Sequence, residues 1–370
     1  QEEKIMYLLP KPKTIKEQDG QMLLCHSTHI VMTKEVAETE MHAAKRLQEA
    51  IRQETGLILP FSVGEVREGD LSLGIAKTLP EQTYEITIDE KGGQISGGDG
   101  AGVLYGVETF CQIVQQCGGI LPCVQIQDAP DMPNRGYYFD QTRGRVLKLE
   151  ELKKIADRMC RYKLNQLQLY VEHTYLFRDF SEMWRDQTPL TAEEILELDS
   201  YCRERHIELV PSLASFGHLC TLLSTKTYGD LCEMEDSWKE PFSFWNRMRY
   251  HTINVSDERS LPLIKKMIAE YMQLFSSNKF NICADETFCL GKYKSKKLAE
   301  ERGVHRLYID YVKELAQFLV ENGKIPMFWG DIIWNSPELM KELPESMICL
   351  HWGYASEQRE DETRAIAQTA

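Results

Sequence analysis

The chain has 370 residues, of which 42% are apolar, and this suffices for one large domain or two ordinary ones. Acidic residues number 57 against 43 basic residues, which gives a net charge of -14. This balance, without any basic stripe or arginine-rich tract, speaks against nucleic acid as a partner and favours a neutral or small ligand. No run of 18 apolar residues occurs, so we expect no membrane span.

The first residue and the cysteines bear on the cellular compartment. The chain begins at Gln1 rather than Met, which we interpret as a removed signal peptide or tag, and we expect a periplasmic or secreted protein. The 11 cysteines are odd in number and scattered, unlike a disulfide framework. Cys111, Cys117 and Cys123 lack the tight spacing of structural zinc, so we predict no metal and no cofactor. Cys283 is predicted to be a small buried residue.

The first 130 residues predict a small α+β domain. A helix over 35–56 has Gly56 as its stop signal, and short strands are predicted over 71–76, 84–89 and 94–96. A glycine-rich turn then opens a second helix within 97–119. Its glycines run Gly100-x-Gly102-x-x-x-Gly106, which is not the G-x-G-x-x-G spacing of a dinucleotide site. We therefore interpret this turn as a close packing of helix against sheet.

The stretch "QIQDAPDMPNRG" (125–136) marks a domain boundary, so we predict domains over 1–130 and 131–370. Beyond it, strands and helices alternate. The predicted strands cover 135–141, 166–172, 207–218, 279–286, 325–331 and 347–353. The predicted helices cover 148–165, a segment from the capping box of Thr191 and Glu194 to about residue 205, then 259–276, 304–321 and 360–369. Residues 219–257 are predicted to be an irregular insertion.

Alternating strands and helices with continuously apolar strands predict a parallel sheet covered by helices, either a barrel or an open doubly wound sheet. Polar and aromatic residues follow nearly every strand: Arg143, Glu172, His173, His218, Asp285, Glu286, Trp329, Asp331, Trp352 and Tyr354. Convergence of many strand ends on one site is typical of the C-terminal face of a barrel. We favour an α/β fold of the (β/α)8 TIM-barrel type, although only about six βα units are visible where a closed barrel has eight.

Asp285 and Glu286 stand side by side where the fourth strand ends. Two close carboxylates oppose each other's ionisation, which supplies an acid and an anion together, as glycosidic bond cleavage requires. The alternative is a structural one, in which both acids begin the segment after the strand. Trp329 and Trp352 could stack on a sugar or belong to the core, and Arg143 could grip vicinal hydroxyls or form a surface ion pair.

Residues 134 to about 355 resemble glycoside hydrolase family 20, the β-N-acetylhexosaminidases. The resemblance rests on five short motifs in the family's order: "RGYYFDQTR" (135–143), "YKLNQLQLYVE" (162–172), "IELVPSLASFGH" (207–218), "FNICADE" (280–286) and "FWGD" (328–331). The N-terminal 130 residues are similar to the non-catalytic α+β domain that precedes such barrels.

The resemblance implies an exo-acting enzyme that hydrolyses terminal β-linked GlcNAc or GalNAc from a glycan or glycoconjugate by substrate-assisted retaining catalysis. The 2-acetamido oxygen attacks the anomeric carbon, Asp285 holds the acetamido N–H, and Glu286 acts as acid and then base. The implied substrate-binding set is Arg143 on hydroxyls, Trp329 and Trp352 around the acetamido group, Tyr354 on the acetamido oxygen, His218 supporting the acid, and Glu172 and Asp331.

The chain departs from the family pattern at several positions. Glu172-His173 stands where the family has Asp-Asp or Glu-Asp, so an acid that orients His218 is lost unless Glu172 takes that role. Cys283-Ala284 replaces two glycines, and "SFGH" lacks a proline. The chain ends before strands seven and eight, so we expect a further chain or a missing C-terminal segment to complete the barrel.

Two alternatives to an active hexosaminidase stay open. One is a degenerate relative that binds carbohydrate without turnover. The other is a different (β/α)-barrel hydrolase, such as a metal-dependent one using His173, His218 and Asp285. No close histidine pair of the H-x-H or H-x-x-x-H kind supports the metal hypothesis.

Overall fold

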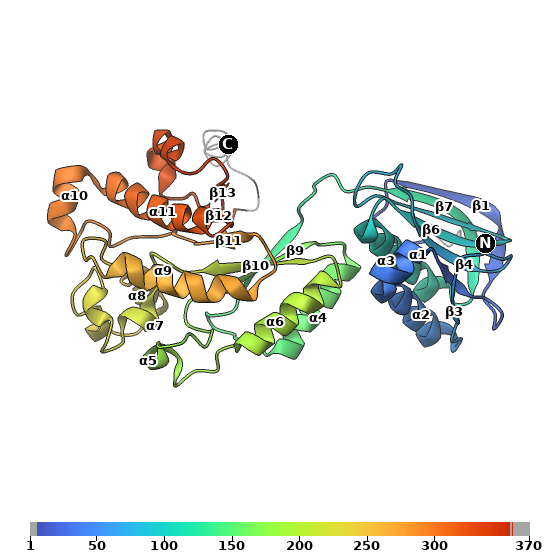
Figure 1. Ribbon diagram of the computed structural model, residues 1–370, viewed down its shortest axis with the longest axis horizontal. Coiled ribbons are helices and arrows are strands. Elements are labelled where there is room, and N and C mark those ends of the chain that lie inside the picture. Colours follow the sequence, from blue (N-terminus) through green and yellow to red (C-terminus); the bar gives the residue numbers. More distant parts are fainter. Residues whose placement is uncertain (1–5, 356, 358–370) are drawn as a thin grey trace. The chain divides into compact units, whose positions relative to one another are not determined.

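The computed structural model describes residues 6–355 and residue 357 (Figure 1). They form two compact units. The first consists of the N-terminal residues up to Tyr137 together with 151–166 and 200–208, and the second contains the rest. Among the described residues, every helix is too short or too polar to cross a membrane.

The first unit is built on a mixed sheet of seven strands in the order β1-β7-β5-β6-β4-β2-β3. The strands are β1 (Thr14–Leu23), β2 (Ile30–Met32), β3 (Phe61–Val63), β4 (Leu71–Ile75), β5 (Tyr84–Asp89), β6 (Gly92–Gly97) and β7 (Ile120–Asp128). Pairings from β1 to β6 along this order are antiparallel, and those from β6 to β3 are parallel. The boundary stretch predicted from residue 125 thus begins inside β7.

Three helices accompany this sheet: α1 (Lys34–Thr39), α2 (Met41–Thr55) and α3 (Gly100–Cys117). The single helix predicted over 35–56 is two helices, because the backbone of Glu40 leaves the helical region at φ -121° and ψ 28°. The Glu40 carboxylate is instead paired with the ring of His206 at 2.8 Å. The stop signal at Gly56 is confirmed by its left-handed φ of 76°.

The glycine-rich turn before α3 brings helix and sheet together. Asp99 caps the helix by accepting the Gly102 backbone N–H at 2.8 Å. A Cβ built on Gly102 would lie 2.2 Å from the carbonyl oxygen of Thr83, which leaves no room for any other residue. The packing interpretation of this turn is therefore confirmed.

The second sheet has six strands in the order β13-β12-β11-β10-β9-β8. They are β8 (Gly136–Asp140), β9 (Gln166–Val171), β10 (Glu208–Leu213), β11 (Lys279–Asn281), β12 (Ile325–Trp329) and β13 (Ile348–Leu350). The pairings from β10 to β13 are parallel. All six residues of β9 are buried, as expected for a parallel strand covered on both faces.

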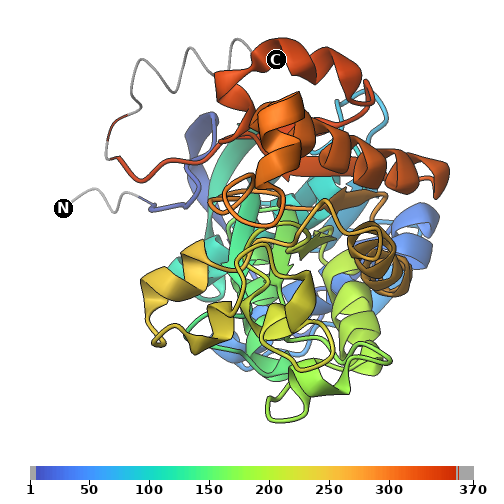
Figure 2. The same ribbon diagram turned by 90° about the vertical axis from the view of Figure 1, so that its left-hand side faces the viewer.

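Helices connect these strands, and α9 and α11 contact each other beside the sheet (Figure 2). The helices are α4 (Leu149–Arg161), α5 (Ser181–Trp184), α6 (Ala192–Arg203), α7 (Cys220–Leu223), α8 (Phe244–Arg249), α9 (Ser260–Tyr271), α10 (Lys296–Arg302) and α11 (Val304–Glu321). The capping box before α6 is confirmed, since Thr191 and Glu194 exchange hydrogen bonds of 2.9 and 3.3 Å.

Two predictions about the extent of secondary-structure elements are wrong, and a third cannot be compared with the structure. β11 ends at Asn281, five residues before the predicted end, because the backbone then turns into left-handed conformations. The insertion 219–257 is not wholly irregular, since it contains α7 and α8. The helix predicted over 360–369 lies outside the described residues.

We expect Gly102→Ala to lower the free energy of unfolding by about 2–3 kcal/mol, because the new methyl group would collide with a backbone carbonyl that cannot rotate away. Chemical denaturation of the full chain measures the change. Gly74→Ala is the matched control: its Cβ would meet only the methyl group of Thr33 at 3.4 Å, so its effect should stay within about 0.5 kcal/mol. Equal effects of the two substitutions would contradict this account.

Candidate active site

A cavity of about 680 Å³ lies at the carboxyl ends of the parallel strands. Six of the predicted site residues line it: Arg143, Asp285, Glu286, Trp329, Trp352 and Tyr354. The structure adds eight residues to this wall: Tyr138, Asp140, Tyr170, Phe244, Trp245, Met248, Arg249 and Phe288. Three other predicted residues do not line the cavity but contact residues that do: Glu172 contacts Tyr170, His218 contacts Asp285, and Asp331 contacts Glu286.

The loop after β11 turns both acids towards the same side. Adjacent residues on a regular strand point to opposite faces. Here the strand ends at Asn281, and Cys283, Ala284 and Glu286 take left-handed φ values of 58°, 62° and 49°. Such conformations cost about 1–2 kcal/mol for each residue that is not glycine, so the surroundings must hold this loop in place.

Two contacts hold the strained loop. The hydroxyl of Tyr308, on α11, donates to the carbonyl oxygen of Ala284 at 3.0 Å. The carboxylate of Asp331, just after β12, accepts the backbone N–H of Glu286 at 3.0 Å. Tyr311, one turn along α11, fixes the neighbouring loop in the same way by donating to Ser215 at 2.9 Å. The two loops that carry His218 and the acids are thus anchored on one helix.

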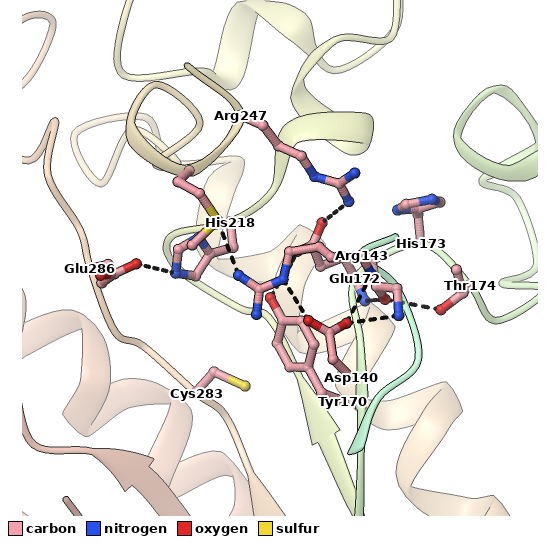
Figure 3. A network of polar contacts seen from close by, with 12 residues as sticks. Asp140, Arg143, Tyr170, Glu172, His173, Thr174, His218, Arg247, Cys283 and Glu286 are labelled. Atoms are coloured by element: carbon pink, nitrogen blue, oxygen red, sulfur yellow. Dashed lines mark hydrogen bonds and ion pairs between the residues drawn. The ribbon is translucent and has the colours of Figure 1, made fainter. Parts of the chain in front are cut away.

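His218 joins the two acids. It lies buried in the exit loop of β10, and its Nε2 is 3.3 Å from Asp285 Oδ2 and 3.4 Å from Glu286 Oε2. Burial opposes the charged imidazole, but the hydrogen bond and negative charge of Asp285 outweigh it and raise the pKa of His218. Figure 3 shows the ring directed at Glu286.

The environment favours a protonated Glu286. Burial raises the pKa of its carboxyl, the charge of His218 counteracts this, and the charge of Asp285 raises the pKa further. A carboxyl that keeps its proton to higher pH is suited to act as a general acid.

Asp331 is a third acid in the same place. Its Oδ1 is buried and has no hydrogen-bond partner among the described residues, while its Oδ2 accepts the Glu286 N–H. Burial, followed by the negative charge of Asp285, raises the pKa of Asp331 to about 7. Because the Asp331 side chain faces the backbone of Glu286, we interpret Asp331 as a residue that supports the loop and not as one that contacts a sugar.

Glu172 occupies the centre of a network next to the cavity (Figure 3). It is 3% exposed, and its two oxygens accept hydrogen bonds from Tyr170 and Arg247, both at 2.9 Å. Arg143 lies 3.8 Å from it and donates to Asp140 at 2.7 Å. Glu172 is therefore the counter-charge of Arg247, while Arg143 is held mainly by Asp140.

Glu172 does not take the missing role of orienting His218. The Nδ1 atom of His218 is buried and finds no hydrogen-bond partner among residues 6–355. His173 does not take that role either, since its Nδ1 lies 3.2 Å from the hydroxyl of Thr221. The departure noted at positions 172–173 thus leaves His218 fixed from the Nε2 side alone.

The aromatic residues from the strands and strand ends form two groups at the cavity. Tyr138 packs edge-on against Trp329, with ring centroids 5.2 Å apart. Trp352 and Tyr354 lie 5.6 Å apart, and Tyr354 is 95% exposed. Both tryptophans line the cavity, which is the position required for stacking on a sugar.

The metal hypothesis is not favoured by this arrangement. In the described part of the chain, the group of possible ligands whose atoms lie within 4.8 Å of one another is His218, Asp285 and Glu286. His173, which the hypothesis needs, is not in this group. Cys283 is buried, as predicted, and burial raises the pKa of its thiol, so it is a poor metal ligand.

Half of the lining residues that sequence reasoning missed come from the insertion 219–257. Helix α8 supplies Phe244, Trp245, Met248 and Arg249, and its remaining arginine, Arg247, binds Glu172. The available signal was the run "FSFWNRMRY" (242–250), which gathers four aromatic residues and two arginines within nine positions. Residue spacing alone does not indicate which strand ends this segment reaches.

We expect the stability of the Asp331→Asn variant, relative to the parent, to rise with pH. The parent gains stability from protonated Asp331 below the unfolded pKa of 3.8 and loses it as the pH rises to about 7, whereas asparagine stays neutral. The free energy of unfolding of the variant minus that of the parent should be roughly 2–3 kcal/mol larger at pH 8 than at pH 5.

Chemical denaturation at the two pH values measures this difference. Asp186→Asn, at a side chain that is 81% exposed, is the control and should give a difference independent of pH. The same flat result for Asp331→Asn would contradict the proposed burial of its charge.

Two family models match the chain. The model described as "Glycosyl hydrolase family 20, domain 2" matches residues 6–129, and "Glycosyl hydrolase family 20, catalytic domain" matches residues 133–369. A beta-hexosaminidase of Porphyromonas gingivalis is 24% identical over 363 residues, which cover 88% of this chain and 45% of that protein. A beta-hexosaminidase of Vibrio furnissii is 26% identical over 310 residues, covering 75% and 48%. The chain thus spans about half the length of these relatives.

Solved structures share the fold. A beta-N-acetylhexosaminidase from Bacteroides fragilis has a TM-score of 0.78 at 19% identity, covering 98% of this chain and 73% of that chain. The GH20 exo beta-N-acetylglucosaminidase from Vibrio harveyi, in complex with N-acetylglucosamine, has a TM-score of 0.79 at 19% identity, covering 98% and 59%. These likenesses confirm the predicted fold, a TIM-barrel type preceded by an α+β domain. Because both family models match and the catalytic one covers more than half of the sequence, the chain belongs to glycosyl hydrolase family 20.

Proposed function

We propose that the protein is an exo-acting β-N-acetylhexosaminidase that hydrolyses terminal β-linked GlcNAc or GalNAc from glycans. The observation that carries the proposal is the shared imidazole, with Asp285 and Glu286 on one side of a single histidine nitrogen. This arrangement provides an anion and a proton donor in one cavity. Membership in family 20 and the likeness to beta-hexosaminidases support the same activity.

The spacing of the acids disfavours an inverting reaction, and membership in family 20 supports the substrate-assisted retaining route. Oxygens of Asp285 and Glu286 lie within 4.8 Å of each other, whereas an inverting pair stands about 6.5–9.5 Å apart to admit a water molecule between acid and base. In the substrate-assisted route the acetamido oxygen of the sugar forms the bond to the anomeric carbon. The protein then has to stabilise the resulting oxazolinium and move one proton.

Each group of the site has a role in this sequence. Glu286 protonates the departing oxygen and afterwards removes a proton from the attacking water. Asp285 accepts the acetamido N–H and stabilises the positive charge that develops on the ring. His218 keeps both carboxylates in place, and Arg143, held at 2.7 Å by Asp140, presents its remaining donors to sugar hydroxyls.

We expect Glu286→Gln to lower kcat by about 10²- to 10⁴-fold on a β-GlcNAc conjugate with a fluorescent aglycone, because the proton donor is lost. The exposed Glu235, which does not line the cavity, provides the control, and Glu235→Gln should match the parent. If a folded parent showed no turnover, the degenerate carbohydrate-binding alternative would be favoured instead.

The pH dependence of kcat gives a second test of Glu286 as the general acid. The reaction needs protonated Glu286, so kcat should fall as the pH rises through its pKa. Because that pKa is raised, the fall should begin above the range of an ordinary carboxyl. A decline centred near pH 4, the ordinary glutamic acid value, would contradict the assignment of Glu286 as the acid.

A further inference from the structure

Helix α8 forms one wall of the cavity, although it belongs to the insertion after β10. Four of its six residues line the cavity: Phe244, Trp245, Met248 and Arg249. The helix begins with a proper cap, since the Ser243 hydroxyl accepts the Asn246 N–H at 3.0 Å. A helix this short is marginal by itself, so its position depends on contacts with the barrel.

Two contacts fix α8 to the strand ends. Arg247 donates to the buried Glu172 at 2.9 Å, and Arg143 donates to the sulfur of Met248 at 3.0 Å. The Glu172 carboxylate is also bound by the Tyr170 hydroxyl, so its geometry is determined from two sides. Figure 3 shows the Arg247 guanidinium directed at Glu172 beside Arg143. The helix is therefore joined to the same carboxylate that faces the predicted sugar-binding arginine.

The outer surface of α8 is aromatic. Phe244 is 57% exposed and Trp245 is 63% exposed, with ring centroids 5.6 Å apart and planes at 77°. Arg249 places its guanidinium 5.3 Å from the centre of the Trp245 ring. Single exposed aromatic residues are ordinary on a protein surface. Two adjacent ones beside a cation, at the edge of the proposed catalytic cavity, indicate a binding surface.

This surface and the proposed proton donor line one cavity. Arg249 and Glu286 are both part of its wall, and Phe288 lines it two residues after that acid. Glu286 protonates the oxygen that links the terminal sugar to the rest of the substrate. The part of the substrate beyond that oxygen therefore enters a cavity that Arg249 and the rings next to it also line.

We propose that α8 is the binding wall for the second sugar of the substrate, with Trp245 stacking on its apolar face and Arg249 donating to its hydroxyls. Glu172 acts through Arg247 as the positioning residue of this wall. The inference deepens the proposed hexosaminidase function and rests on it. Its consequence is a preference for glycans with at least two sugars over simple glycosides.

The test compares kcat/KM for a β-linked GlcNAc disaccharide with kcat/KM for methyl β-GlcNAc. Trp245→Ser should lower the disaccharide-to-methyl ratio about tenfold, the equivalent of one stacking contact of roughly 1.4 kcal/mol. Trp238→Ser is the matched control, because Trp238 lies in the same insertion, is 60% exposed and does not line this cavity. A Trp245→Ser ratio equal to that of Trp238→Ser would overturn the proposal.

The role of Arg247 is tested with the same two substrates. Arg247→Met should lower the disaccharide-to-methyl ratio mainly through a higher KM for the disaccharide, and Arg247→Lys should restore part of it by keeping the cation. A purely structural role would instead lower kcat for both substrates equally, and Lys would not restore the ratio. If Arg247→Met fails to fold, Trp245→Ser still decides the matter.

Failure of the proposed function gives a different result. A parent that hydrolyses neither substrate contradicts the hexosaminidase proposal. Calorimetric titration of that parent with GlcNAc and with the disaccharide then still tests the wall. Tighter binding of the disaccharide, lost in Trp245→Ser and kept in Trp238→Ser, supports it, and equal affinities for the two sugars overturn it.

Discussion

One ring nitrogen of His218 is shared by Asp285 and Glu286, at 3.3 and 3.4 Å, and the chemistry of the site depends on this contact. Two neighbouring carboxylates would otherwise repel each other and turn apart. The shared contact requires both side chains on one face, which a regular strand cannot provide. The left-handed turn at 283–286 provides it, and Tyr308 and Asp331 hold that turn. Catalytic geometry and backbone strain are thus parts of one arrangement.

Asp331 supports this loop without adding a further full negative charge to the site. A protonated carboxyl still accepts a hydrogen bond through its carbonyl oxygen, so Asp331 can hold the Glu286 N–H in either state. With its pKa raised to about 7, it is largely neutral in mildly acidic conditions. Asp331 can therefore support the loop in that pH range without placing a full negative charge beside Asp285.

The parts of the structure that local pattern determines could be predicted from the sequence. Helix α11 and strand β5 have their predicted bounds, because apolar periodicity and turn residues act within a few positions. The early end of β11 was missed, since Cys283 and Ala284 are not glycines. The two glycines of the resembled family at these positions were the available sign, and in this chain Tyr308 and Asp331 hold the left-handed backbone from distant elements. The wall formed by α8 was missed for the same reason: its place is set by Arg247 and Glu172, which are 75 residues apart.

The departure at Glu172-His173 is best understood through that ion pair. A carboxylate at position 172 that oriented His218 would leave Arg247 without its buried counter-charge, whereas Arg143 would keep its hydrogen bond to Asp140. In this chain the two oxygens of Glu172 accept hydrogen bonds from Tyr170 and Arg247, and the Nδ1 atom of His218 has no hydrogen-bond partner in the part of the chain that the structure describes. Glu172 thus supports the wall formed by α8 and does not support the proposed proton donor through His218. A buried ion pair adds little net stability, but it fixes geometry strongly because either partner alone is costly to bury. The pair therefore makes sense as a device for holding α8 at the cavity, where the second sugar of a glycan would lie.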